Sequence, residues 1–522
     1  MRPVFDPRKN RTVKLQDVYL DDLLSRLDNA LGEQDGSDLE RTLSKAMQRA
    51  GTESALVKAI QSVAQATPRE DALPSLRQRL MSAKLGLPET LEPKVEPVAP
   101  AEPSEFCPVV PSNWGEMKLT TAAAEELVLK CLMGRGTASG REIADQVAVP
   151  FGLLNGLLNQ LKSDRLVVHR GAAPLGDYLY QLSEGGQEAA VRYSAQCPYD
   201  GAAPVRLQDY VDSVHAQSIH KHVPTFQEIR DCFADLVVDP EVLDQVGQAM
   251  YAGRGFFLYG ASGNGKTSMA ERVSRAFGKT IWIPRSLTVD GAIIRLFDPC
   301  NHVEVAPASS EGLYDPCKID RRWVRIRRPT ILAGGELTMD RLEIRSTAPG
   351  ISEAPLQLKS NGGTLVIDDF GRQRMRPDEL LNRWIVPLDR RIDYLNLPNG
   401  KTIQVPFEQL LVFSTNMRPQ DLADEAFLRR VPYKIRALDP TKSQFKELLR
   451  RESDRVGVTY HEAAVDHLID KHYQDAGRPI RACHARDLLA QVKAYCEFKQ
   501  LPLEMSPDHF ESAVRNYFAI MD

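Results

Sequence analysis

The sequence predicts an α/β fold, a parallel sheet with helices on both faces that is preceded and followed by helical segments. From about residue 205 onward, apolar stretches alternate with helical patterns, which is typical of an open sheet with crossover helices. Three of the apolar stretches end in polar residues, as strands that lead into a site do: 256–259, 362–367 and 409–415. Residues 15–85 show apolar spacings of three and four, and four more helices are expected within 441–522.

Length and composition limit the class of protein. The 522 residues are too many for one compact core, so roughly two to four domains are expected. The 66 Lys and Arg nearly balance the 70 Asp and Glu, so no global basic field favours nucleic acid or anionic lipid. There is no run of about 18 apolar residues and no apolar signal segment. We therefore expect a cytoplasmic protein without a membrane span, whose eight cysteines are reduced.

The first 200 residues divide into three predicted parts. Residues 1–86 have the periodicity of an all-helical domain and no polar cluster that would indicate a function. Residues 87–113 are rich in proline and acids, which predicts an extended linker. Residues 114–200 contain three helical patterns followed by two short strands, and Ser139 is expected to cap the second helix.

Residues 114–200 resemble a winged helix-turn-helix domain, with the wing between strands expected at 167–171 and 177–186. In such a domain the third helix, here 151–166, contacts DNA, or the scaffold serves as a protein-docking module. Residues 116–194 hold eight Lys and Arg against nine Asp and Glu, a net charge of −1 (8 − 9). DNA-binding domains present a basic face, so the charge favours protein docking over DNA binding.

The strongest motif follows the apolar strand 256–259. It is Gly260-Ala-Ser-Gly-Asn-Gly-Lys266-Thr267, the phosphate-loop pattern GxxxxGK[ST] between a strand and a helix. Glycines let the backbone turn its N–H groups around phosphates, and the helix directs the positive end of its dipole toward them. We expect Lys266 to bind the β- and γ-phosphates and Thr267 to coordinate Mg²⁺. The residues expected to hold the nucleotide are Gly260, Ala261, Ser262, Gly263, Asn264, Gly265, Lys266, Thr267 and Ser268.

Two adjacent acids end the second apolar strand. In Gly362-Gly-Thr-Leu-Val-Ile-Asp368-Asp369, we expect the strand to lie beside that of the phosphate loop, with its acids over the same crevice. Asp368 would then hold Mg²⁺, directly or through water. Asp369 would orient and deprotonate the attacking water.

The third strand and a short helix after it supply further candidates. Asn416 ends the apolar strand 409–415, where its amide can position the water or contact the γ-phosphate. Arg429 and Arg430 follow the short helix expected near 425–428. A guanidinium supplied across a subunit interface stabilises charge on a transferring phosphoryl group. The alternative is a surface-exposed arginine pair, the usual state of arginine.

The segments GASGNGKT, TLVIDDF, LLVFSTN and FLRRVPYKI, in that order, resemble those of an AAA+ ATPase, a branch of the P-loop NTPases. The resemblance covers about 220–522. It identifies the segments as Walker A, Walker B, sensor 1 at Asn416 and an arginine finger at Arg429 or Arg430. It implies ATP and Mg²⁺ as ligands and a homo-oligomeric ring, expected to be a hexamer.

The same resemblance implies two subdomains. A large α/β subdomain is expected at 205–438 and a helical lid at 439–522, which carries the sensor 2 arginine at Arg486 or Arg481. Most AAA+ Walker B motifs end Asp-Glu, whereas this one ends Asp-Asp; the shorter second acid implies a shifted water or slow hydrolysis.

Three phrases carry a closer likeness: GNGKTSMAERV, EAPLQLKSNGG and DEAFLRRVPYKI. They are similar to those of a bacterial group described as predicted ATPases with chaperone activity, associated with Flp pilus assembly. This likeness implies a protein client without identifying it.

Residues 285–361 are expected to be a long insertion in the ATPase part. The alternation of apolar residues and arginines at 324–327 fits an exposed β-hairpin strand, with 329–337 as the return strand. Such a strand lines a central pore, contacts nucleic acid through arginine and Trp323, or is a solvated or subunit-interface strand. Irregular spacing and the lack of a fourth ligand argue against a metal site at Cys300, His302 and Cys317.

The sequence thus supports an ATPase that couples ATP hydrolysis to remodelling of a protein assembly. The alternative is a DNA-binding, ATP-dependent regulator or loader that uses residues 114–200 and the basic stretch 321–328. The acidic balance of 116–194 favours the first hypothesis. A third, a nucleotide-bound scaffold with weak turnover, depends only on the Asp-Asp ending.

Overall fold

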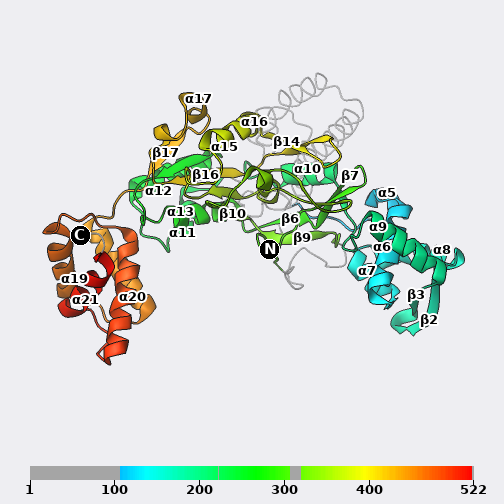
Figure 1. Ribbon diagram of the computed structural model, residues 1–522, viewed down its shortest axis with the longest axis horizontal. Coiled ribbons are helices and arrows are strands. Elements are labelled where there is room, and N and C mark those ends of the chain that lie inside the picture. Colours follow the sequence, from blue (N-terminus) through cyan, green and yellow to red (C-terminus); the bar gives the residue numbers. More distant parts are fainter. Residues whose placement is uncertain (1–105, 222, 306–318, 520–522) are drawn as a thin grey trace, which may run out of the picture. The chain divides into compact units, whose positions relative to one another are not determined.

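The computed structural model describes residues 106–221, 223–305 and 319–519 (Figure 1). The helical domain expected at 1–86, most of the linker expected at 87–113, and Cys317 lie outside the described residues. No described helix has the length and apolar character that crossing a membrane requires.

A five-stranded sheet in the order β10-β13-β16-β5-β17 forms the centre of the fold, and all its pairs are parallel. Its strands are β5 (Phe256–Tyr259), β10 (Thr330–Ala333), β13 (Thr364–Ile367), β16 (Leu410–Thr415) and β17 (Tyr433–Arg436). The expectation that β13 lies beside β5 was wrong, because β16 lies between them. Val412 of β16 pairs with Phe256 on one side and with Val366 on the other.

Helices cover both faces of this sheet, as the sequence predicts (Figure 1). Side chains alternate along each strand, so Phe256 and Leu258 enter one core while Phe257 enters the other. The first core packs against α11 (Phe226–Cys232), α12 (Pro240–Tyr251), α13 (Lys266–Arg272) and the 3₁₀ turn η3 (Val273–Phe277). The second core packs against α14 (Leu356–Lys359), α15 (Pro377–Arg383), α16 (Ile385–Arg390), α17 (Glu425–Leu428) and the 3₁₀ turn η5 (Met339–Leu342).

A second sheet has mixed directions and the order β11-β12-β8-β7-β4. Its strands are β4 (Val205–Arg206), β7 (Ser286–Val289), β8 (Ala292–Arg295), β11 (Arg345–Ala348) and β12 (Ile351–Glu353). Helix α10 (Leu207–Ala216) and the hairpin β14 (Ile392–Asn396) and β15 (Thr402–Pro406) share a core with this sheet. A 3₁₀ turn, η6 (Pro419–Asp421), follows β16.

The basic strand that was expected to form an exposed hairpin pairs with a different strand. Strand β9 (Trp323–Arg327) pairs antiparallel with β6 (Thr280–Pro284) and not with the residues after it. Its apolar side chains are buried, with Trp323 7% exposed. Pro329 follows, and the chain continues into β10 of the central sheet. The hairpin prediction was therefore wrong, and part of 285–361 belongs to the central sheet.

Residues 114–203 form five α-helices, a 3₁₀ turn and a small antiparallel sheet in the order β1-β3-β2, and their buried apolar side chains share one core. Each of the predicted helices and both predicted strands are observed. The helix after them is an addition, because Ser183 caps it where the strand was expected to continue. Ser139 caps α7 in a capping box with Glu142, as expected. The elements are α5 (Trp114–Met117), α6 (Thr121–Arg135), β1 (Thr137–Ser139), α7 (Gly140–Val147), α8 (Phe151–Ser163), β2 (Val167–Ala173), η2 (Pro174–Gly176), β3 (Asp177–Leu182) and α9 (Glu184–Gln196).

The C-terminal helices pack around a core of their own. The four helices that the sequence predicts are observed, and the second continues as a π-helical turn, η7 (Asp470–Gln474). The helices are α18 (Lys442–Val456), α19 (Glu462–Ile469), α20 (Ala482–Lys499) and α21 (Pro507–Phe518).

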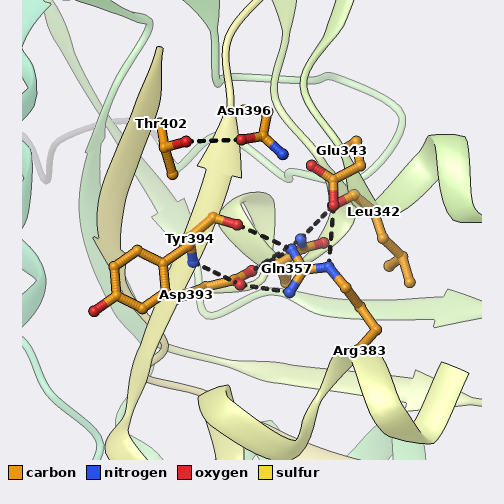
Figure 2. A network of polar contacts seen from close by, with 8 residues as sticks. All are labelled: Leu342, Glu343, Gln357, Arg383, Asp393, Tyr394, Asn396 and Thr402. Carbon is orange, nitrogen blue, oxygen red and sulfur yellow. Dashed lines mark hydrogen bonds and ion pairs between the residues drawn. The ribbon is translucent and has the colours of Figure 1, made fainter. Parts of the chain in front are cut away.

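A buried ion-pair network joins the hairpin β14–β15 to α15 and α14 (Figure 2). The Arg383 guanidinium donates to both carboxylate oxygens of Asp393, at 2.6 and 3.1 Å, and to Glu343 Oε1 at 3.0 Å. Gln357 Nε2 donates to Asp393 Oδ2 and to the Leu342 carbonyl. The Asp393 side chain is 1% exposed, so this carboxylate depends on its partners for every hydrogen bond.

The substitution Arg383→Ala is expected to lower the free energy of unfolding by about 3 kcal/mol, because it leaves the Asp393 carboxylate buried without its main partner. Denaturant unfolding of the full chain measures this change. Arg376→Ala is the matched control, since Arg376 pairs with Asp378 at the surface, where ion pairs contribute little. Equal effects of the two substitutions would contradict the prediction.

Candidate functional site

A cavity of about 420 Å³ opens at the carboxyl ends of the central strands. The loop after β5, the acids after β13, Asn416 after β16 and Ala437 after β17 all contribute to its wall. Its lining residues from the predicted set are Ser262, Gly263, Asn264, Gly265, Lys266, Thr267, Ser268, Asp368, Asp369, Asn416 and Arg486. Parallel strands bring these distant segments together because their carboxyl ends share one edge of the sheet.

The loop between β5 and α13 has the backbone conformation that its glycines permit. Gly263 has φ +86° and Gly265 has φ +74°, in the left-handed region that glycine adopts without steric cost. Gly265 is the N-cap of α13, so the helix begins at Lys266. The first N–H groups of a helix have no partner within it, and together with the positive end of the helix dipole they stabilise an anion at the helix start.

Lys266 is the buried cation of the cavity. Its side chain donates to the carbonyls of Gly260 and Ala261, at 3.1 and 3.0 Å, and to Asn416 Oδ1 at 2.7 Å. Burial lowers the pKa of Lys266, while the charges of Asp369 and Asp368 act in the opposite direction. The ammonium is thus held in place by three oxygens, beside two carboxylates.

Thr267 and Asp368 form an oxygen-rich pair. The Thr267 hydroxyl donates to Asp368, with Oγ1 at 2.9 Å from Oδ2 and 3.1 Å from Oδ1. The backbone of Asp368 is fixed by its N–H bond to the Ala333 carbonyl and by Gln373, whose amide donates to its carbonyl. Hydroxyl and carboxylate oxygens are the ligands that Mg²⁺ prefers, so this pair fits that ion.

Asp369 is exposed to the cavity and has a left-handed backbone, with φ +48°. Its Oδ1 accepts a long hydrogen bond from Asn416 Nδ2, at 3.4 Å. Asp is among the few residues enriched at positive φ, because its short polar side chain tolerates that conformation. This backbone gives a physical reason for Asp at a position where the resemblance expects Glu.

C-terminal residues complete the cavity. The Cys483 N–H donates to the Gly263 carbonyl at 2.8 Å, and Asn264 Nδ2 donates to Asp439 Oδ1 at 2.6 Å. Asp439 also forms an ion pair with Arg481. Of the two arginines predicted for this side, Arg486 lines the cavity, whereas Arg481 does not line it but is near enough for its charge to lower the pKa of Lys266.

Arg429 and Arg430 do not line the cavity of their own chain. Arg430 is held within the subunit, since its Nε donates to Asp389 Oδ2 at 2.8 Å and its Nη1 to the Ala426 carbonyl at 2.6 Å. Arg429 is exposed, and its side chain has no hydrogen-bond or ion-pair partner among the residues that the structure describes. The two adjacent arginines therefore occupy different environments.

Several cavity residues were not predicted. Leu236, Val237 and Val238 form an apolar wall, and Asp239 caps α12 through the N–H of Glu241. The Asp-Pro start of this helix is visible in the sequence, but it indicates a cap and not a cavity. The C-terminal set, Asp439, Gln444 and Cys483, carries no local signal, because only the packing of α18 and α20 brings these residues to the loop.

We expect Gly263→Ala to separate the loop from α20, because a Cβ there would lie 2.4 Å from Cys483 Sγ. The N–H of Cys483 should lose its partner and exchange its hydrogen faster, which hydrogen-exchange mass spectrometry measures. Gly265→Ala is the control, since it carries the same left-handed strain of about 1 kcal/mol but meets nothing within 4 Å. Adding Cys483→Ala should restore slow exchange at residue 483 in the Gly263→Ala variant. Equal exchange in the two single variants would contradict the contact.

The C-terminal helices are similar to a known protein family. Residues 441–516 match a family described as a domain of unknown function (DUF8689). No curated protein matches the chain.

Some solved structures are similar over about half of the chain. The RuvB Holliday junction branch migration motor of Thermotoga maritima is 15% identical over 53% of this chain and 70% of that one, with a TM-score of 0.31. NtrX from Brucella abortus in complex with ATP is 10% identical over 52% of this chain and 51% of that one, with a TM-score of 0.34. Similarity this low assigns neither a fold nor an activity to the present chain.

Proposed function

We propose that this chain is a cytoplasmic AAA+ ATPase that binds ATP with Mg²⁺ in the cavity and hydrolyses it. The convergence of Lys266, Asn416, Asp369 and the Thr267–Asp368 pair at one sheet edge carries this proposal. Phosphoryl transfer to water is catalysed by groups of these kinds: a buried ammonium, a hydroxyl–carboxylate pair and a carboxylate exposed to the cavity. The volume of the cavity lies in the range of small-molecule sites.

In this proposal, the loop backbone, Lys266 and the Thr267–Asp368 pair have separate roles. The backbone N–H groups at 262–268 bind phosphate oxygens at the start of α13. Lys266 exchanges its bonds to Asn416 and the loop carbonyls for bonds to the β- and γ-phosphates. Thr267 and Asp368 would hold Mg²⁺, which supplies positive charge to the phosphate oxygens when bound.

Asp369 and Asn416 act on the attacking water in this proposal. Once Lys266 turns to the phosphates, Asn416 is free to hold the water through its amide while it donates to Asp369. The Asp369 carboxylate then accepts a proton from that water. Its exposure to the cavity permits this contact.

We further propose that Arg429 is the arginine that enters the site of a neighbouring subunit in a ring. Its exposure and its lack of a partner among the described residues support it over Arg430, which Asp389 holds. Arg430 would then fix the end of α17, from which Arg429 projects. On the lid side, the position of Arg486 in the cavity wall supports it over Arg481 as the arginine that contacts nucleotide.

We take residues 114–200 as a winged-helix domain. The surface of this domain favours a protein assembly as its partner. Its wing exposes Val168, Leu175, Tyr178 and Leu179, with Leu175 81% exposed at the tip. Apolar side chains at a wing suit contact with protein, whereas DNA contact needs cations for the phosphates. Trp323, which one of the three alternatives for the basic strand places in contact with nucleic acid, is buried and unsuited to that contact. The likeness to the Flp pilus-associated group names one assembly to test.

We expect Lys266→Ala to weaken ATP binding roughly 10- to 100-fold, because it removes charge-assisted hydrogen bonds to the phosphates. Calorimetric titration of the full chain with Mg-ATP measures the affinity. Lys434→Ala is the matched control: this lysine lies on β17 of the same sheet, and its ammonium binds the carbonyls of Leu428 and Pro432. Unchanged affinity in Lys266→Ala would refute binding in this cavity.

Arg429→Ala should reduce ATP hydrolysis by about 10³-fold while ATP binding survives, because the guanidinium acts on the neighbour's phosphate. Arg430→Ala should chiefly lower stability. Mixing Arg429→Ala subunits with Lys266→Ala subunits is expected to restore part of the hydrolysis, since each supplies what the other lacks. Normal turnover by Arg429→Ala, or no recovery on mixing, would exclude a role between subunits.

A further inference from the structure

Three side chains of the metal-binding types converge among the C-terminal helices, away from the nucleotide cavity. His467 lies on α19, His472 in the π turn η7 and Glu511 on α21. Glu511 Oε1 is 3.1 Å from His472 Nε2 and 3.5 Å from His467 Nε2. One ligand atom from each residue lies within 4.8 Å of the others.

The π turn explains why two histidines five residues apart share a face. In an uninterrupted α-helix, residues five apart point about 140° away from each other. Here the helix is π-helical over Asp470–Gln474, with the N–H of Asp475 bonded to the Asp470 carbonyl five residues back, so the last part of the span from His467 to His472 is wider than an α-helix. Both rings then reach Glu511 on α21, and π turns of this kind are frequent at functional sites.

We propose that His467, His472 and Glu511 form a binding site for Zn²⁺, with water in the fourth position. Zinc binds histidine nitrogens and carboxylate oxygens at about 2.0 Å in a tetrahedron, which sets these atoms roughly 3.4 Å apart. The two separations to Glu511 are already close to that value. The side chains of His467 and Glu511 are 38% and 31% exposed, so an ion has access from solvent.

Lys471 competes for this site, because its ammonium also binds Glu511 Oε1. Its side chain is 53% exposed and has a flexible stem, so it can turn into solvent when a metal displaces it. Loss of this cation should therefore strengthen metal binding. The bound ion would join the π turn to α21 through direct bonds in place of ion pairs.

Calorimetric titration of the full chain with ZnCl₂ tests the proposal. Wild type should bind one equivalent of zinc that is lost in the double variant His467→Ala and His472→Ala. Lys471→Ala should bind that equivalent more tightly. His461→Ala is the control, since His461 precedes α19 and pairs with Glu504, which lies outside the three-residue cluster.

Circular dichroism checks that each variant folds. If the double variant does not fold, Glu511→Gln replaces it, because this change keeps the shape and removes the anionic ligand. Equal numbers of bound zinc ions in wild type and the folded ligand variant would overturn the proposal. So would an affinity that Lys471→Ala leaves unchanged.

Discussion

The site depends on the placement of β16, which pairs with β13 on one side and with β5 on the other. Since all three strands are parallel, β16 sets its own carboxyl end between the loop after β5 and the acids after β13. This is why Asn416 contacts both Lys266 and Asp369. A sheet order in which β5 and β13 were neighbours would leave Asn416 at the side of these two groups and not between them.

The C-terminal helices supply the second wall, and both backbone and side-chain contacts hold them against the loop. Cys483 bonds to the Gly263 carbonyl, and the absence of a side chain at Gly263 leaves space for the Cys483 sulfur. Asp439 joins Asn264 of the loop to Arg481 at the start of α20. A change of loop conformation on ligand binding would therefore reach α20 directly.

Local patterns in the sequence predicted the strands β5, β13 and β16, the helices α6, α7 and α8, and the four C-terminal helices, because each of these depends on residues close together in the chain. The same patterns missed the position of β16 and the pairing of β9 with β6, which depend on contacts between distant segments. Trp323 shows why: alternation along 323–327 is the same for an exposed hairpin and for a covered strand, and only the partner decides which. The apolar wall before Asp239 was missed for the same reason.

The charge of the cavity wall couples the binding of nucleotide to the binding of a divalent cation in the proposed reaction. Four carboxylates line it, those of Asp239, Asp368, Asp369 and Asp439, against the two cations Lys266 and Arg486, a formal charge of −2 (2 − 4). A polyphosphate entering alone would meet net repulsion. Nucleotide and divalent cation should therefore strengthen each other's binding by the same factor, as thermodynamic linkage requires. The cellular level of free magnesium would then set the effective affinity for ATP.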